Sequence, residues 1–500
     1  MKKFSLALSA LLLAGFALPF AGCSKSDEKV VTLRVSSWEE YIDLGKWDEE
    51  EAIELTDLTI CPEKSMVDDF TEWFNEGDHG FKVRVEYSTF GTNEDLYNRL
   101  SLGDTYDLVC PSDYMIMKLL DEGRLEKYSA EFLEDGEYTN NVSPYIAQVY
   151  EDYGWTEYAA CYMWGTSGFV YNPEKLVNES DISSCEILLN PDYNRAVTIK
   201  DNVRDAYFAT LSIIYNEELT AGNLTPEKLS EYLNDTASET IAKAEDVLKK
   251  IKNNVYSFET DSGKADMVTG KVVANYQWSG DAVYIMDEAD GDDTELWYSV
   301  PEECSNLWFD GWVMLKDGIK DNAQKREAAE AFVNFLAKPE NAIRNMYYIG
   351  YTSAIATDEV FEYLEWNYGL EDGEEAEVYE YDLNYFFGGE GDEYTVYADA
   401  ANFDVGDNGV NRGRQLFAQY PPQNVIDRSV VMLDFGKKLS EINQMWINVR
   451  CPDLKDTSPV VWGVVGGIAG VSVIAICLYV FRYKLFSGYR PKKGYEKVEK

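Results

Sequence analysis

The sequence predicts an α/β protein with two lobes built on parallel, doubly wound sheets. Strand-like and helix-like segments alternate from residue 31 to residue 123, and the alternation returns between residues 196 and 337. Regular alternation of this kind favours a parallel sheet with helices on its faces. The region 24–459 is also longer than one hydrophobic core usually serves, which favours two lobes over one.

The first alternation can be followed element by element. Val31, Leu33 and Val35 alternate with polar residues, which is typical of a strand. The apolar residues of 66–74 recur at helical spacing behind Ser65, a residue suited to cap a helix. The other elements expected here are strands at 81–87 and 107–110 and helices at 93–102 and 114–122, the last closed by Gly123.

The second half of the chain repeats the pattern with different residues. Strands are expected at 196–200, 272–277 and 311–315, and helices from Pro226, at 237–252 and at 325–337, where Pro339 ends the last one. Residues 361–425 are rich in Tyr, Glu, Asp and Gly and show only patchy periodicity. They are predicted to form an inserted surface subdomain.

Aromatic, hydroxyl and carboxylate side chains follow most of the expected strands, and Trp308, Phe309 and Asp310 precede the one at 311–315. In parallel sheets, ligands bind beyond the carboxyl ends of the strands, so these side chains are expected to meet at one rim. The candidate walls are Trp38, Tyr41, Ser112, Tyr114, Trp278, Trp308 and Tyr351, and the candidate anchors are Asp205, Asp281 and Asp310. Carboxylates bind ammonium groups, and aromatic faces cover methylenes and attract cations. The set therefore suits a flexible organic cation such as a polyamine.

The amino-terminal residues are typical of an export signal. Lys2 and Lys3 precede an apolar run, and Ala21 and Gly22 lead to Cys23. Residues 1–23 are therefore predicted to be a signal peptide of the lipoprotein type, with Cys23 as the lipidated residue.

A membrane helix is predicted near the other end. Residues 460–481 carry no charge, and at roughly 1.5 Å per residue they can cross a hydrocarbon core of about 30 Å. Basic residues outnumber acidic ones in 482–500, which predicts a cytoplasmic tail. The expected protein is thus a single-pass protein of the cell membrane whose large domain lies outside the cell.

Composition excludes several classes of function. The net charge of −46 excludes nucleic acid as a partner of the outer domain. The single histidine, His79, excludes most histidine-dependent hydrolases and metal sites. The cysteines of the outer region are scattered without a CxxC pair, so they are expected to be buried thiols. Neither a zinc site nor a site for another cofactor is expected.

Short segments of the chain resemble the spermidine/putrescine-binding proteins of bacterial ABC importers. They occur in that family's order, and the resemblance covers residues 31–355 and extends more loosely to about 450. The segments are Ser37–Tyr41, Tyr87–Phe90, Tyr106–Tyr114, Trp164–Thr166, Gln277–Asp281, Trp308–Asp310 and Ile349–Tyr351.

The resemblance implies a two-lobed periplasmic-binding-protein fold of type II, with a crossover hinge and no catalysis. It implies a first lobe of residues 31–153 and 305–355 and a second of 155–300 and 426–450. It also implies that putrescine or spermidine is captured between the lobes and passed to an ABC permease and its ATPase.

The resemblance further implies roles for the candidate residues. Trp38, Tyr41, Tyr114 and Ser112 would form one wall, and Trp278 and Trp308 would enclose the methylenes of the ligand. Asp310 would bind an amine, and Asp281 would do the same, as in the putrescine-type members.

The chain also departs from the family. Asn202 and Asp205 stand where the family has an acidic pair, so the length of the ligand stays open. Residues 43–63 and 361–425 are insertions relative to the simpler members.

Three alternatives remain open at this point. The adjacent Tyr347 and Tyr348 would suit ferric iron in a similar fold. Paired carboxylates would suit a carbohydrate-active enzyme, which needs no histidine. The sequons that begin at Asn141, Asn178, Asn223 and Asn234 would suit a eukaryotic receptor.

Overall fold

The computed structural model describes residues 29–222, 224–260, 262–370, 375–406 and 409–451. The protein separates into one unit that ends at Asn443 and a second unit that begins at Gln444, of which only the end of helix α20 (Leu439–Arg450) and Cys451 are described. The predicted signal peptide, membrane helix and basic tail lie outside the described residues. Within the described ranges, no helix is long and apolar enough to span a membrane.

The first lobe is built on three parallel strands. β1 (Val30–Trp38) lies between β4 (Lys82–Phe90) and β5 (Leu108–Val109), and Val35 is opposite Tyr87 on one side and Leu108 on the other. Helices follow the strands in the predicted order. They are α1 (Met66–Glu76), α2 (Asn93–Leu102) and α3 (Asp113–Asp121).

Local capping explains why these helices begin where the sequence predicts. The hydroxyls of Ser65 and Thr92 accept hydrogen bonds from the third backbone N–H of α1 and α2, respectively. Gly103 ends α2 with a φ of 105°, a conformation that residues with a side chain rarely adopt. The capping hydroxyls and this glycine therefore determine where the helices of the lobe begin and end.

The second lobe contains a similar parallel core. β8 (Val197–Lys200) lies between β9 (Ser257–Glu259) and β10 (Ala274–Trp278), and both neighbours run parallel to it. The helices of this lobe are α7 (Val203–Ile214), α8 (Asn216–Thr220), α9 (Pro226–Leu233), α10 (Ser238–Asn254), α11 (Ser262–Val268) and α12 (Ser279–Asp290).

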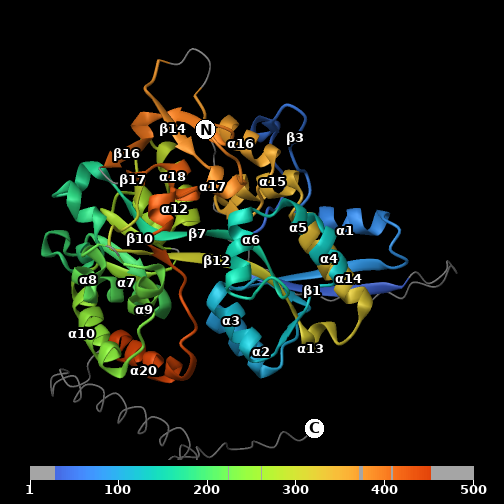
Figure 1. Cartoon of the computed structure of the whole chain (residues 1–500), viewed down its shortest axis with the longest axis horizontal. Helices are drawn as coiled ribbons and strands as arrows, with labels where there is room; N and C mark the ends of the chain where they lie inside the picture. The colour runs from blue at the N-terminus through green and yellow to red at the C-terminus, as the bar shows by residue number, and fades with distance from the viewer. Residues whose placement is uncertain (1–28, 223, 261, 371–374, 407–408, 452–500) are drawn as a thin grey trace, which may run out of the picture. The chain divides into compact units, whose positions relative to one another are not determined.

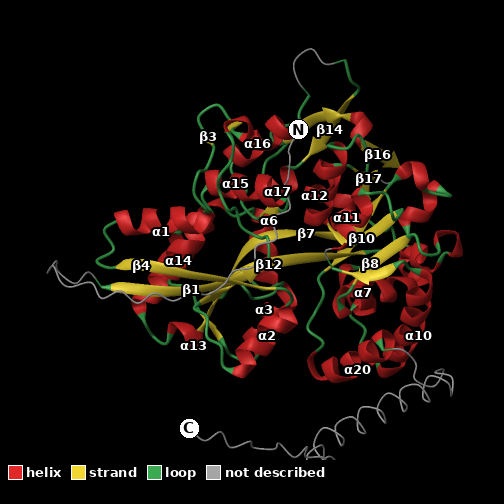
Figure 2. Ribbon diagram, turned by 180° about the vertical axis from the view of Figure 1, so that it is seen from behind, coloured by secondary structure: helices red, strands yellow, loops and turns green. Residues whose placement is uncertain are grey.

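Two long antiparallel strands, β7 (Ala159–Tyr171) and β12 (Ser305–Leu315), run through both lobes and join them (Figures 1 and 2). β12 pairs with β5 of the first lobe, and β7 pairs with β10 of the second. Every residue of both strands is buried. The lobes therefore share one continuous mixed sheet, as a crossover fold requires.

The sequence placed the start of this crossing strand wrongly. Trp308, Phe309 and Asp310 were expected to precede a strand at 311–315, but they lie inside β12. A strand that is buried on both faces shows no alternation of polar and apolar residues, so its start is hard to recognise. Pro339 was also expected only to end a helix, yet it begins α15 (Pro339–Ile349) in the favourable first position.

The segment 361–425 is more than a surface addition. β17 (Gly409–Gly413) pairs with β11 (Trp297–Ser299), and β16 (Phe403–Gly406) pairs with β17, so the two strands extend the second-lobe sheet. Phe386 and Tyr420 are fully buried. The core of this segment is aromatic rather than aliphatic, which is why periodicity of aliphatic residues did not reveal it. The exact lobe boundaries remain a prediction.

A buried ion pair ties the segment 43–63 to the first lobe. Arg344 donates from Nε to Oδ1 of Asp43 at 2.6 Å, and Asp43 is completely buried. Trp47 donates from Nε1 to the other oxygen of Asp43 at 2.7 Å. Arg344 also pairs with Asp69 of α1 at 2.7 Å. This insertion is therefore anchored by charge as well as by packing.

The bounds of the remaining elements are β2 (Ile53–Glu54), β3 (Thr59–Ile60), β6 (Leu125–Glu126), α4 (Ala130–Asp135), α5 (Glu137–Asn141), α6 (Pro144–Asp152), α13 (Lys316–Ile319), α14 (Ala323–Leu336), β13 (Thr352–Ser353), α16 (Asp358–Tyr368), β14 (Val378–Asp382), α17 (Asn384–Phe387), β15 (Thr395–Asp399), α18 (Gln415–Gln419), α19 (Gln423–Ile426) and β18 (Ser429–Val430).

Candidate functional site

The predicted site residues come from both lobes and from a crossing strand. Trp38, Tyr41, Ser112 and Tyr114 belong to the first lobe; Asp205, Trp278 and Asp281 belong to the second; Trp308 and Asp310 lie on β12; Tyr351 follows α15. The three aspartates, Tyr41, Tyr114 and Trp308 are buried, and the others are half-buried.

Asp310 lies at an irregularity in the crossing strands. The pairing of β12 with β7 shifts register between Asp310 and Gly311, and such bulges redirect side chains. Asp310 forms an isolated bridge with Ser112, and its Oδ2 accepts a hydrogen bond of 2.7 Å from the Tyr41 hydroxyl. Its Oδ1 is buried with no hydrogen-bond partner among the described residues. One oxygen is thus held by the Tyr41 hydroxyl, and the other has no such partner.

Burial changes the acidity of the carboxyls around this point. It raises the pKa of Asp310 to about 6, against the lowering effect of the Ser112 and Tyr41 hydroxyls. It also raises the pKa of Asp113 to about 8, although backbone N–H groups of Tyr114 and Phe309 oppose the change. Asp113 accepts from the Phe309 N–H at 3.1 Å and so holds β12 beside Asp310.

Aromatic rings from different parts of the chain meet in the candidate site. The rings of Tyr41 and Tyr351 meet edge to face at 4.9 Å between centroids, and Trp308 lies 5.7 Å from Tyr351. Trp38 of the first lobe meets Trp278 of the second at 6.4 Å, so the two lobes touch through tryptophans. Edge-to-face pairs at such distances are favourable.

Two glycines make this close packing possible. A Cβ at Gly280 would lie 2.2 Å from the Tyr351 ring, and a Cβ at Gly165 would lie 2.2 Å from Oγ of Ser279 and 2.7 Å from the Trp308 ring. Both glycines belong to segments that the sequence singled out. Glycine is needed at these positions because neighbouring side chains approach the backbone closely, and not because of an unusual backbone angle.

Asp205 lies in the first turn of α7, where the helix dipole favours a carboxylate. Its Oδ1 accepts a hydrogen bond of 3.3 Å from Nε1 of Trp278. Burial raises the pKa of Asp205 to about 6, although Lys200 and the Trp278 hydrogen bond oppose the rise. The structure thus brings together this predicted anchor and this predicted wall.

Asp281 has different neighbours from those that the resemblance implied. Lys200 lies 3.4 Å from its Oδ2, and Lys264 lies 2.9 Å from its Oδ1. Burial alone would raise the pKa of Asp281, but the two lysines outweigh burial and hold the pKa below its ordinary value. Cations of the chain itself therefore surround the carboxylate that was expected to meet a ligand amine.

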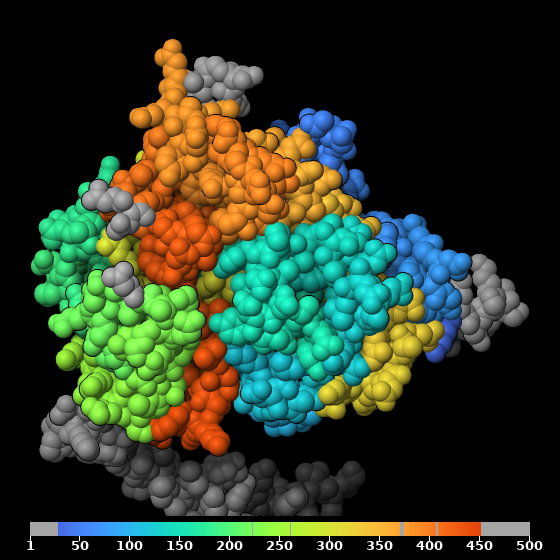
Figure 3. All heavy atoms as spheres, in the orientation of Figure 1, coloured from blue at the N-terminus to red at the C-terminus, as the bar shows by residue number. Residues whose placement is uncertain are grey.

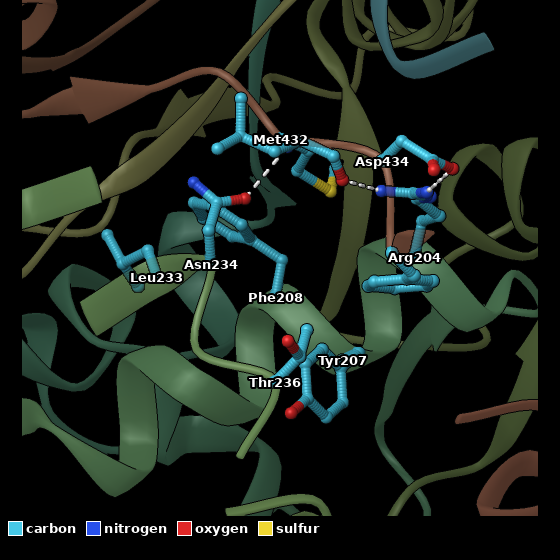
Figure 4. A pocket seen from close by; sticks show the side chains of 10 residues that line it. Arg204, Tyr207, Phe208, Leu233, Asn234, Thr236, Met432 and Asp434 are labelled. Atoms are coloured by element: carbon cyan, nitrogen blue, oxygen red, sulfur yellow. Dashed lines mark hydrogen bonds and ion pairs between the residues drawn. The ribbon is translucent and has the colours of Figure 1, made fainter. Parts of the chain in front are cut away.

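Arg204 is a further cation that the sequence reading missed. Its guanidinium lies 3.9 Å from the centre of the Tyr114 ring and 3.8 Å from that of Phe435, so it is placed between a first-lobe ring and the segment that follows β18. It also donates to the Leu433 carbonyl and pairs with Asp434 at 3.4 Å. Figure 4 shows Arg204 extended toward Asp434 beside a small pocket that Tyr207, Phe208 and Met432 also line.

The segment after β18 lies between the lobes. In Figure 3 it appears in orange-red between the green helices of the second lobe and the cyan helices of the first. The Leu433 N–H donates to Oδ1 of Asn234 at 2.8 Å, and Nδ2 of Asn234 donates to the Val431 carbonyl at 3.1 Å. These bonds fix the segment on the second lobe.

A signal for the missed cations was present in the sequence. Lys200 is the charged last residue of the predicted strand 196–200, and Arg204 stands one residue before the predicted Asp205. A charge at the end of a buried strand points toward the ligand rim of a parallel sheet. The partners of these cations, Asp281 and Phe435, are too distant in sequence to be inferred.

The geometry gives no support to the iron alternative. No group of three or more His, Cys, Asp or Glu side chains that could hold a metal ion occurs in the part of the chain that the structure describes. Tyr347 packs on Trp47 at 4.9 Å, while the next residue, Tyr348, is 40% exposed. Cys110, Cys161, Cys185 and Cys304 are buried free thiols, as expected, whereas Cys61 and Cys451 are exposed.

The two lobes, the shared crossing strands and a rim of aromatic and carboxylate groups define a two-lobed solute-binding protein. A model of the bacterial extracellular solute-binding protein family matches residues 65–364, and the chain belongs to that family. Its relatives are transport proteins that bind solutes and are not enzymes.

Curated relatives share about a quarter of their residues with this chain. The spermidine/putrescine-binding periplasmic protein of Salmonella typhimurium is 26% identical over 356 residues, which cover 70% of this chain and 84% of the relative. The putrescine-binding periplasmic protein SpuD of Pseudomonas aeruginosa is 27% identical over 350 residues, 68% of this chain and 82% of the relative.

Solved structures share the fold. The spermidine/putrescine ABC transporter substrate-binding protein PotD of Streptococcus pneumoniae has a TM-score of 0.53 at 23% identity and covers 84% of this chain and 98% of its own. The TpPotD lipoprotein of Treponema pallidum has a TM-score of 0.55 at 16% identity and covers 84% and 99%. These similarities establish the two-domain α/β fold of the periplasmic binding proteins.

Proposed function

We propose that this chain captures a polyamine between its two lobes and serves as the substrate-binding component of an ABC importer. The observation that carries the proposal is the Asp310 carboxylate. One of its oxygens is held by Tyr41, and the other is buried without a hydrogen-bond partner among the described residues. A buried carboxylate oxygen without a partner is costly unless a cationic donor meets it.

The surroundings of Asp310 support the same ligand class. Tyr41, Tyr351 and Trp308 form a connected set of rings, and such surfaces cover methylenes and attract ammonium groups by roughly 0.5–2 kcal/mol each. Asp205 supplies a second carboxylate from the other lobe. A flexible chain with an ammonium at each end combines both kinds of contact.

The curated relatives support the same cargo, because those described above carry spermidine/putrescine-binding or putrescine-binding in their names. In this proposal, an ABC permease with its ATPase receives the ligand from the closed lobes. The chain itself performs no chemistry.

The proposal places the binding domain outside the cell and attached to the membrane. The features that support it are the export signal of residues 1–23, the cysteine at its end, the uncharged stretch 460–481 and the basic residues that follow. Mass spectrometry of the membrane-extracted protein tests the lipid. A diacylated Cys23 agrees with the proposal, and a free amino terminus at another residue contradicts it.

A thermal-shift screen tests the cargo. A ligand that binds the folded state at about 100 times its Kd adds roughly 2.7 kcal/mol of stability, which raises the melting temperature. Putrescine or spermidine is expected to give such a rise, and ferric citrate and neutral oligosaccharides are expected to give none. A rise with ferric citrate or with an oligosaccharide, and none with either amine, would refute the proposed cargo.

A further inference from the structure

Lys200 occupies the kind of environment that an ammonium ligand requires. Its side chain is 1% exposed, and its Nζ lies 3.9 Å from the centre of the Trp278 ring and 3.4 Å from Oδ2 of Asp281. Nζ also donates to the Thr260 carbonyl at 2.9 Å. An aromatic face, a carboxylate and a carbonyl oxygen together form a complete site for one primary ammonium.

Both oxygens of the carboxylate in this site already contact a cation of the chain. Lys200 takes Oδ2 of Asp281, and Lys264 approaches Oδ1 at 2.9 Å. Asp281 is 4% exposed, so water does not replace these contacts. A ligand amine that approached Asp281 would therefore come close to a lysine that is attached to the chain.

The other two carboxylates are in a different state. Among the described residues, neither Asp205 nor Asp310 forms a salt bridge, and each accepts a hydrogen bond from a neutral donor, Trp278 at 3.3 Å and Tyr41 at 2.7 Å. Both are buried. Neither carboxylate has a salt-bridge partner among the described residues, although Lys200 and Arg204 act on Asp205 from beyond that distance, so an ammonium group of a ligand can balance each of them.

We propose that Lys200 is a built-in ammonium that fills one amine position of the cleft and makes the site selective for diamines over triamines. This inference rests on the proposed polyamine function and names the ligand more narrowly. A third ammonium on the ligand would approach the Lys200 ammonium in a buried space. Like charges repel one another more strongly in a buried space than in water.

Removal of Lys200 should therefore open the site to a longer ligand. In Lys200→Met, an unbranched side chain can still cover Trp278, but the charge is gone and Oδ2 of Asp281 becomes available. Lys264 still balances part of the Asp281 charge. The vacated position then suits the additional amine of spermidine.

The matched control is Lys271→Met. The Lys271 ammonium lies 4.5 Å from the Tyr256 ring and 2.8 Å from Asp266, so it makes the same kinds of contact as Lys200. Its side chain is 47% exposed, and it lies outside the proposed site. This variant separates the loss of a charge in the cleft from the loss of a cation–π contact in general.

Competition calorimetry with putrescine and spermidine on the full-length protein in detergent tests the inference. The wild type is expected to bind putrescine roughly tenfold more tightly than spermidine or better, and Lys200→Met is expected to reduce this ratio about tenfold. Lys271→Met is expected to keep the wild-type ratio.

Two results would overturn the role of Lys200 while the polyamine function stands. One is a wild type that binds spermidine as tightly as putrescine, which needs no variant and does not depend on how a variant folds. The other is an unchanged ratio in Lys200→Met with a wild-type circular dichroism spectrum. Absence of binding of either amine to the wild type would overturn both the inference and the proposed function.

Discussion

The hydroxyl of Tyr41 donates a hydrogen bond of 2.7 Å to Oδ2 of Asp310, although the two residues are 269 positions apart in the sequence. The bond joins the turn after β1 to a strand that runs through both lobes. It holds one carboxylate oxygen, and the other is buried without a hydrogen-bond partner among the described residues. The predictions below begin from this contact.

Asp310→Asn is expected to raise the Kd for putrescine roughly tenfold or more. Asparagine keeps the size of the side chain and its contact with Tyr41, but the charge-assisted bond to an ammonium becomes a weaker neutral one. Calorimetry measures the change, and Asp317→Asn at an exposed position of α13 is the control. Wild-type affinity in a folded Asp310→Asn protein would remove Asp310 from the site.

Polyamine affinity is expected to fall as the pH decreases from 8 to 5. Burial raises the pKa of Asp205 and of Asp310 to about 6, so both carboxylates become protonated below that pH and no longer attract an ammonium. Binding selects the ionised forms and should release protons near pH 6. Calorimetry in buffers of different ionisation enthalpy measures this release. An affinity that is flat from pH 8 to pH 5 contradicts the prediction.

Arg204→Met is expected to loosen the segment that follows β18. The substitution removes the contacts with the Tyr114 and Phe435 rings and the ion pair with Asp434. Each cation–π contact contributes roughly 0.5–2 kcal/mol. Hydrogen exchange of residues 431–435 should become faster. Arg84→Met on the exposed side of β4 is the control, and equal protection in both variants would show that Arg204 does not hold this segment.

Asp43→Ala is expected to destabilise the protein by about 3–5 kcal/mol. The substitution leaves the buried Arg344 guanidinium without its main partner, and breaking a buried pair from one side has a cost of this size. Chemical denaturation measures the change. The control is Asp48→Ala, because Asp48 is exposed. A loss below about 1 kcal/mol would mean that Asp69 alone satisfies Arg344.

Much of the fold followed from the sequence, because local signals fix local elements. Ser65 and Thr92 cap helices that begin where the pattern predicted, and the strands between them carry regular alternation. The sequence pattern did not predict the elements correctly where a strand is buried on both faces, as in β12. It also failed where aromatic residues form the core, as around Phe386. Periodicity in the sequence identifies elements that have one polar and one apolar face, and these segments do not have two such faces.

The aromatic residues and aspartates of the candidate site were expected from the sequence and remain predictions as binding residues, whereas the cations beside them were not expected. The rule that loops at strand ends converge led to the pairing of Trp38 with Trp278, whose rings lie 6.4 Å apart, whereas Asp310 lies inside β12 and not beyond a strand end. The pairing of Asp281 with Lys200 and Lys264 depends on how side chains from separate elements point into one space. The spacing of these residues in the sequence does not predict that arrangement.

Titration of the detergent-solubilised full-length protein with putrescine tests the central claim most directly. The account predicts one binding site per chain in the wild type and a Kd that rises roughly tenfold or more in Asp310→Asn. A wild-type protein that shows no binding of putrescine or spermidine, but binds ferric citrate or an oligosaccharide, would contradict the account.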